Sequence, residues 1–273
     1  MSEDHHEGQR VSRRRLLAGV SSVSLTGLLA ACTGGSTSAA PTVTTSTGET
    51  VSPEATTNND LTSLFENSGT CTLTASTTQG PYYFDADKIR ADVREDRQGK
   101  RLRVAFKLQD SETCKPVPNA VIEIWHCDAA GLYSGAEAQS GGASGGGGQP
   151  GGGAQDLTPA DDKRYLRGAQ VANADGIVEF TTIWPGWYRG RTTHIHVMVH
   201  VSNERVLTTQ VMFDEKLNSA VYAAPPYAAH SGRDTFNDND SIYRSEMLMT
   251  VKADGDGYLG SLVLNADSDR DGA

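Results

Sequence analysis

One stretch, Trp184–His200, constrains the fold of this chain more than any other; it reads WPGWYRGRTTHIHVMVH. A Pro-Gly turn lies near its start, and from Thr193 onward residues alternate between two faces, as they do in a β-strand. The alternation places His194 and His196 on one face, roughly 6.5–7 Å apart at Cα with parallel side chains. That spacing lets two imidazoles reach one metal ion. Tyr188, upstream of a sharp corner, can turn back toward the same ion.

The rest of the chain predicts many short strands separated by turns. Apolar or alternating runs predict strands at 101–108, 120–125, 177–183, 193–201, 206–213, 247–251 and 258–264. The run at 120–125 is apolar on both faces except at Glu123, which is typical of a central strand. Short helices are expected at 60–67, with Asp60 as N-cap, and at 216–222. The pattern predicts an all-β protein with a β-sandwich core, short helices and long loops.

Four further segments place this stretch in a family context: GPYYF at 80–84, YLRG at 165–168, NADGIVEFTTIWPGWY at 173–188 and TQVMF at 209–213. Together they resemble the intradiol ring-cleavage dioxygenases, from about Cys71 to the C-terminal strands. In that family a β-sandwich domain holds a non-haem ferric ion with two tyrosines and two histidines. The resemblance implies an Fe(III) site built from Tyr133, Tyr188, His194 and His196. Phenolate suits hard ferric iron, and the metal itself drives the loss of the phenol proton.

The resemblance also implies a reaction. A catechol-type substrate would bind through both oxygens, and dioxygen would cleave the ring between the two hydroxyl-bearing carbons to give a muconate-type diacid. Tyr188 is the tyrosine expected to leave the metal when the substrate binds. Arg191 matches an arginine that stabilises negative charge on the activated ring, and Gln210 matches a glutamine of the same pocket. The substrate cavity is expected to be lined by Gly80, Pro81 and Tyr82.

Two other functions are compatible with part of the pattern. A zinc or other divalent-metal hydrolase on a β-scaffold could use His194, His196 and His230, but it would leave both tyrosines and Arg191 without a role. A non-catalytic, transthyretin-like binding module would have no need of an intact ligand set. Visible colour and oxygen uptake with catechol would separate the three functions.

The N-terminal region is expected to be a targeting signal and not part of the folded domain. The residues SRRRLL at 12–17 resemble a twin-arginine export signal, and the apolar run after them ends in LAAC at 29–32, which resembles a lipobox. Residues 1–31 are therefore expected to be a signal peptide. Lipidation of Cys32 would anchor the exported protein to a membrane of the cell envelope.

The remaining chain is expected to divide into a tether and one domain. Residues 32–67 are rich in Ser and Thr and predict a flexible tether; residues 68–273 are the expected dioxygenase-type domain, with a glycine-rich insertion near 136–155. The net charge of −10 offers no electrostatic footprint for nucleic acid, so no nucleic-acid partner is expected. The sequence leaves the oligomeric state and the ring substituents of the substrate open.

Three thiols remain beside Cys32, and export permits a disulfide. Cys114 and Cys127 lie at opposite ends of one predicted strand, so roughly 30 Å would separate them. A disulfide needs Cα atoms within about 7 Å. Cys71 lies upstream of Gly80 by about one strand length, at the end away from the expected metal. We therefore expect a Cys71–Cys114 disulfide and a free Cys127.

Overall fold

The computed structural model describes residues 43–44, 50–51, 61–66, 71–141 and 156–272. The expected signal peptide, Cys32, most of the expected tether and the centre of the glycine-rich insertion lie outside these residues. In the described part of the chain, no helix has the length and apolar composition of a membrane span.

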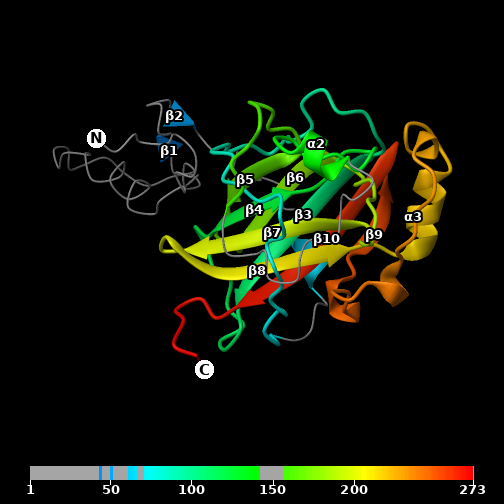
Figure 1. Ribbon diagram of the computed structural model, residues 1–273. Coiled ribbons are helices and arrows are strands. Elements are labelled where there is room, and N and C mark those ends of the chain that lie inside the picture. Colours follow the sequence, from blue (N-terminus) through cyan, green and yellow to red (C-terminus); the bar gives the residue numbers. More distant parts are fainter. Residues whose placement is uncertain (1–42, 45–49, 52–60, 67–70, 142–155, 273) are drawn as a thin grey trace, which may run out of the picture.

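Two four-stranded sheets make up most of the described chain (Figure 1). The first contains, in spatial order, β6 (Ile177–Ile183), β3 (Arg101–Asp110), β10 (Gly257–Ala266) and β9 (Thr250–Asp254). The second contains β5 (Arg167–Val171), β4 (Val121–Trp125), β7 (His194–Val201) and β8 (Glu204–Met212). Neighbouring strands run antiparallel in both sheets, except that β3 and β10 are parallel. β4 lies inside its sheet, as its apolar run predicts.

The two sheets share one hydrophobic cluster. The alternating apolar residues of β3 and of β7 both belong to it: Leu102, Val104, Phe106, Leu108, Ile195, Val197 and Val199. Full burial of each such side chain contributes about 1.5–3 kcal/mol to folding. Because successive side chains of a strand point to opposite faces, this arrangement leaves His194 and His196 on the face of β7 away from the shared cluster.

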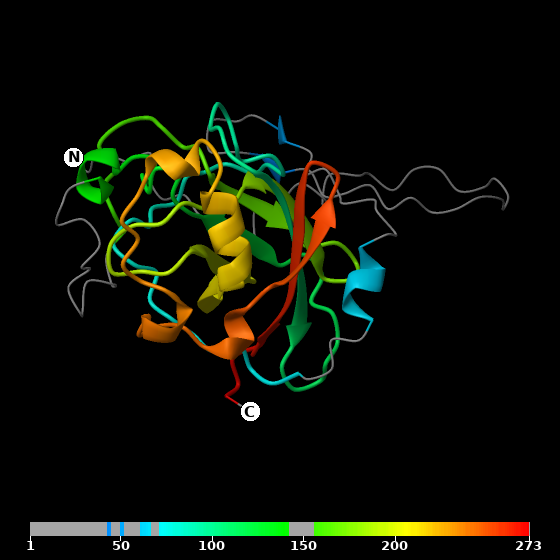
Figure 2. The ribbon, with the colours of Figure 1, turned by 90° about the vertical axis from the view of Figure 1, so that its right-hand side faces the viewer.

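One longer helix closes the end of the sheets where β6 ends and β7 begins (Figures 1 and 2). α3 (Glu215–Tyr222) follows β8 directly and is N-capped by the side chain of Asp214. The indole N–H of Trp184, just past β6, donates to Oδ1 of Asn218 on α3 at 3.0 Å. This contact holds α3 beside the turn that leads into β7.

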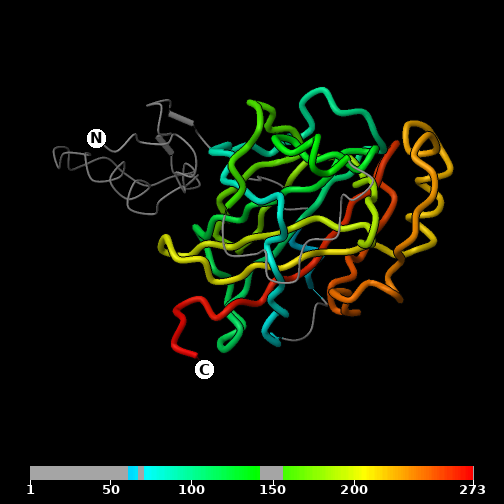
Figure 3. The backbone as a smooth tube through the Cα atoms, in the orientation of Figure 1, coloured from blue at the N-terminus to red at the C-terminus, as the bar shows by residue number. Residues whose placement is uncertain are grey.

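The other elements are short. They are β1 (Val43–Thr44), β2 (Thr50–Val51), η1 (Thr62–Phe65), α2 (Glu137–Ser140), η2 (Tyr227–Ala229), η3 (Asn237–Asn239) and η4 (Ser245–Met247). Figure 3 traces the long connection from α3 to β9 that carries η2, η3 and η4. Leu61, just before η1, and Phe65 of η1 pack against the first sheet, at Ala105, Ile177 and Leu259. The tether expected to end at 67 therefore ends before Leu61.

Most predicted strands are confirmed, and β6 has the predicted bounds. β5 was missed because buried Arg167 and Gln170 interrupt the apolar pattern by which a strand is recognised. β9 begins at Thr250 and not at 247, since Met247 belongs to η4. The helix expected at 60–67 is a 3-10 helix whose N-cap is Leu61, with no side-chain cap; Asp60 lies outside the described residues.

The thiols are placed as predicted. Cys71 and Cys114 form a disulfide with a Cα–Cα distance of 5.4 Å. Cys127 is free and buried. The disulfide attaches the segment before Gly80 to the turn between β3 and β4.

Candidate metal centre

Two imidazoles project side by side from the start of β7. His194 and His196 are both buried, and their Nε2 atoms lie 3.1 Å apart. The Nδ1 atom of His194 lies 2.6 Å from the carbonyl oxygen of Thr192. Because a carbonyl oxygen only accepts, Nδ1 of His194 carries the proton and its Nε2 presents a lone pair to the centre.

Tyr188 reaches the same point from the corner before β7. Tyr188 and Arg191 form an isolated antiparallel bridge, which folds the chain back over the histidines. The hydroxyl oxygen of Tyr188 lies 3.2 Å from Nε2 of His194. The corner also needs Gly186, because a Cβ there would lie 2.2 Å from the carbonyl oxygen of Asp128.

Tyr133 arrives from the loop after β4. The carboxylate of Asp128 accepts the N–H groups of Ala130 (2.9 Å) and Leu132 (3.0 Å), which turns this loop back toward the sheet. The fully buried hydroxyl of Tyr133 lies 3.4 Å from Nε2 of His194. All four residues that the sequence assigned to the metal therefore meet at one point, although they come from three separate segments.

The donor set fits a highly charged cation. Burial raises the pKa of both Tyr133 and Tyr188 and lowers the pKa of both His194 and His196, so without a cation all four groups are neutral at pH 7. Two imidazole nitrogens and two phenol oxygens then face one another in a site with little contact with water. A ferric ion would be held by these residues, and its charge would favour the phenolate form that burial alone opposes.

Trp125 supports the second histidine. Its ring stacks on the ring of His196 with centroids 4.8 Å apart and planes only 6° from parallel. The two residues are direct neighbours in the β4–β7 register. The sequence did not indicate this contact, because cross-strand register is not visible in one chain segment.

Arg191 and Gln210 lie beside the four residues. Gln210 is the β8 residue opposite His196 in the sheet, and its side-chain oxygen accepts a hydrogen bond from Nη2 of Arg191. Nε of Arg191 lies 3.0 Å from Oδ2 of Asp240. The positive charge of Arg191 lowers the pKa of Tyr188 and so opposes the effect of burial.

Asp240 is a residue of this network that the sequence did not indicate. It lies in the NDND run at 237–240, which by composition is an ordinary polar loop. Yet its side chain is fully buried in a salt bridge with Arg191. Only the folded chain brings the two together, across 49 residues.

The segment at 80–82 borders the site only in part. Gly80 has a φ of +73°, and a Cβ there would lie 3.2 Å from Cε1 of His196. The ring of Tyr82 packs 4.7 Å from that of Tyr133 and 6.2 Å from that of Tyr188. Pro81 lies between them and is exposed to solvent. Gly80 and Tyr82 thus contact the predicted ligands directly.

The three-histidine alternative finds no geometric support. His230 stacks on Trp187 with ring centroids 4.0 Å apart. Among the described residues, no third His, Cys, Asp or Glu forms a ligand group with His194 and His196; such a group occurs only at Glu112, Asp267, Asp269 and Asp271. A metal ion at this point would therefore need the tyrosines as further ligands.

Comparisons with known proteins show what the whole chain is similar to. No family model matches the chain. It is similar to the solved intradiol ring-cleavage dioxygenase from Tetranychus urticae, with 32% identity and a TM-score of 0.64 over 72% of this chain and 96% of that protein. It is 26% identical to the chlorocatechol 1,2-dioxygenase of Rhodococcus opacus over 70% of each chain. Its match to the catechol 1,2-dioxygenase 1 of Acinetobacter lwoffii, 27% identical, spans 45% of that protein.

Proposed function

Because this chain belongs to the intradiol ring-cleavage dioxygenase family, we propose that it is a non-haem Fe(III) enzyme that cleaves catechol-type rings with dioxygen. Cleavage falls between the two hydroxyl-bearing carbons and gives a muconate-type diacid. The two sheets would form a β-sandwich of the intradiol type, with the metal bound at one end. The observation that carries the proposal is the convergence of Tyr133, Tyr188, His194 and His196 on one buried point.

The chemistry divides between the metal and the chain. Bound Fe(III) would supply a Lewis acid that takes both catechol oxygens and draws electron density from the ring. His194 and His196 are neutral donors, so they add no charge to the centre. Tyr133, which is fully buried, would hold the metal throughout.

Tyr188 and Arg191 are the residues whose interactions would change during the reaction. Oη of Tyr188, once replaced by a substrate oxygen, would hold a proton taken from a catechol hydroxyl. Arg191 would stabilise the negative charge that grows on the ring, because a fixed cation in a site shielded from water acts more strongly than in solution. The aromatic ring of Tyr82 provides a wall of the site and helps to exclude water.

The names of the relatives suggest a choice of substrates. One acts on chlorocatechol and one on catechol. For this chain we propose a catechol-type substrate whose ring substituents are to be found by oxygen uptake with a panel of catechols.

Product analysis under ¹⁸O₂ tests the reaction. Catechol should give cis,cis-muconate that carries both labelled atoms. A yellow semialdehyde, formed by cleavage beside the diol, would contradict the proposal. So would the absence of oxygen consumption with every catechol of the panel.

We propose in addition that the enzyme is exported and lipid-anchored. The support is the twin-arginine-like segment at 12–17 followed by LAAC at 29–32. Residues 32–60, which precede the packed Leu61, would then tether the domain to the membrane. A tether of this composition spans on the order of 30 Å, which would place the site within reach of extracellular aromatics.

A further inference from the structure

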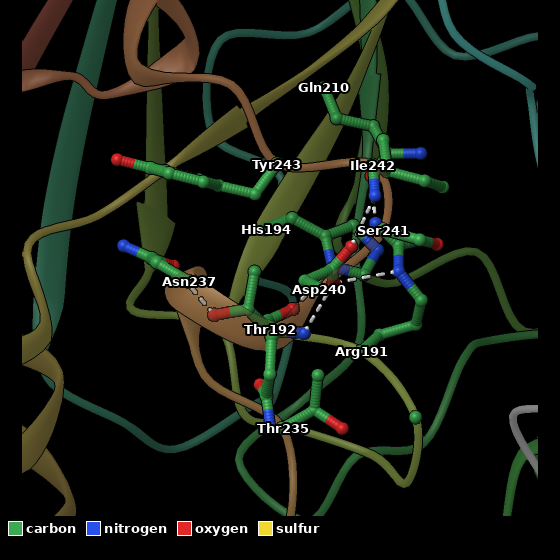
Figure 4. A network of polar contacts seen from close by, with 12 residues as sticks. Arg191, Thr192, His194, Gln210, Thr235, Asn237, Asp240, Ser241, Ile242 and Tyr243 are labelled. Carbon is green, nitrogen blue, oxygen red and sulfur yellow. Dashed lines mark hydrogen bonds and ion pairs between the residues drawn. The ribbon is translucent and has the colours of Figure 1, made fainter.

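Asp240 lies on the loop between η3 and η4, and its side chain is fully buried beside the metal centre (Figure 4). Its carboxylate accepts three hydrogen bonds. Oδ2 accepts Nε–H of Arg191 at 3.0 Å and the backbone N–H of Thr192 at 2.8 Å. Oδ1 accepts the backbone N–H of Ile242 at 2.8 Å. One carboxylate therefore connects its own loop to the segment that leads into β7.

The first consequence concerns the position of a charge. The guanidinium of Arg191 is fixed at Nε by Asp240 and at Nη2 by Gln210. These are the hydrogen bonds that the guanidinium makes within the described part of the chain. Two fixed nitrogens allow the planar guanidinium one orientation, whereas a side chain held at one point could rotate.

The second consequence concerns a ligand. The backbone of Thr192 is held at its N–H by Asp240, and the carbonyl oxygen of the same residue, in the next peptide unit, accepts from Nδ1 of His194. The side-chain hydroxyl of Thr192 lies 2.7 Å from Oδ1 of Asn237, which gives this residue a second point of attachment. The orientation of the His194 ring thus depends on the placement of a residue whose backbone Asp240 holds.

We propose that Asp240 is a positioning residue for the reaction. It holds the charge of Arg191 beside the substrate and the imidazole of His194 toward the metal, and it touches neither substrate nor metal itself. This inference rests on the proposed function. A carboxylate suits the role because both of its oxygens accept, while the carboxamide of an asparagine has one accepting oxygen and a donating NH₂.

The test compares Asp240→Asn with a matched control, Asp234→Asn. Asp234 also accepts a backbone N–H of the corner, that of Gly190 at 3.1 Å, but it is exposed and contacts neither Arg191 nor Thr192. Asp240→Asn should lower kcat with catechol by about 10- to 100-fold, the range found for groups that orient metal ligands, with a smaller change in KM. It should also speed the loss of iron to a chelator, followed at the tyrosinate absorption band. Asp234→Asn should change neither.

The Arg191→Met background separates positioning from general damage. Asp240 acts on the substrate ring through Arg191. Adding Asp240→Asn to the Arg191→Met variant should therefore leave kcat per bound iron unchanged. Iron loss should still become faster, since Thr192 and His194 are unaffected by the first change. Asp240→Asn alone leaves the buried charge of Arg191 without its carboxylate, whereas the double variant leaves no unpaired buried charge. The double variant can therefore be measured even if Asp240→Asn alone does not fold.

Three results would overturn the inference. Asp240→Asn could match Asp234→Asn and wild type in both kcat and iron loss. It could lower kcat per bound iron by the same factor with and without Arg191. A wild type that holds no iron would overturn this inference and the proposed function together, whereas an active wild type with an unaffected Asp240→Asn overturns this inference alone.

Discussion

The Nε2 atoms of His194 and His196 lie 3.1 Å apart. The proton on Nδ1 of His194, which Thr192 binds, leaves a lone pair on Nε2 of that ring. Nδ1 of His196 is buried and has no hydrogen-bond partner among the described residues. Without a cation, Nε2 of His196 can carry its proton and donate to that lone pair. A cation between the two rings would instead take a lone pair from each Nε2 atom and from both tyrosine oxygens.

Loss of either imidazole should therefore empty the site. His194→Ala and His196→Ala should each lower iron affinity by more than the roughly 10- to 100-fold that loss of an outer partner costs. Tyr188→Phe should keep some iron and shift the visible absorption, because one of two phenolates is removed. Metal analysis and absorption spectra check this. If both histidine variants keep full iron and colour, the assignment of the ligands is wrong.

Arg191 should affect turnover more than substrate binding. Its charge matters most when the ring becomes electron-rich, so Arg191→Ala should lower kcat by about 10²–10³-fold with a smaller change in KM. Arg191→Lys should keep only part of the wild-type kcat, since one ammonium cannot reproduce both fixed contacts of the guanidinium. The neighbouring Arg189, whose side chain is 65% exposed, is the control. Steady-state kinetics in which Arg191→Ala and Arg189→Ala behave alike would contradict this prediction.

The Cys71–Cys114 disulfide should contribute about 4 kcal/mol to the free energy of unfolding. The two residues are 43 apart, and closing a loop of this length restricts the unfolded chain by roughly that amount. Urea unfolding of wild type and of the double Cys→Ser variant, each with and without reductant, measures it. Reductant should destabilise only the wild type. Equal stability of the two proteins without reductant would argue against the contribution.

Glu123 should make stability depend on pH. Burial, helped by the charge of Asp85, raises the pKa of Glu123 to about 8, and Tyr83 donates to its carboxylate at 3.1 Å. The folded state thus binds more protons than the unfolded state between the ordinary glutamate pKa and about 8. The stabilisation is full below that window and is lost as pH rises through it, by up to about 1.4 kcal/mol per unit. The free energy of unfolding of Glu123→Gln, measured in urea, should rise relative to that of wild type from pH 5 to pH 8. A difference between the two proteins that does not vary with pH would contradict this.

The proposed lipid anchor can be tested at Cys32. Cys32→Ser should prevent lipidation, so the protein should be released from the membrane or remain unprocessed. Detergent-phase partition and mass analysis of the mature N-terminus check this. Cleavage at a site away from Cys32, with an unmodified and wholly soluble product, would contradict the anchor.

Local chemistry explains what the sequence predicted well. The period-two alternation at Thr193–Val201 identified a strand and put His194 and His196 on one face, because a pleated strand allows no other arrangement. β5 escaped prediction for a related reason. Arg167 is buried there by hydrogen bonds to the carbonyl oxygens of Tyr82 and Ser134, which compensate its charge only in the folded chain.

By itself, the sequence predicted most of the strands and the parity of the two histidines, which depend on backbone geometry and residue type along one segment. The four donors followed from the resemblance to the family, and the pairing of Cys71 with Cys114 followed from strand length. Only the tertiary structure decided that Trp125 stacks on His196 and that Asp240 holds Arg191. Both contacts join segments that are distant in the chain, and no local pattern specifies them, because they arise when the sheets pack and the loops close over their end.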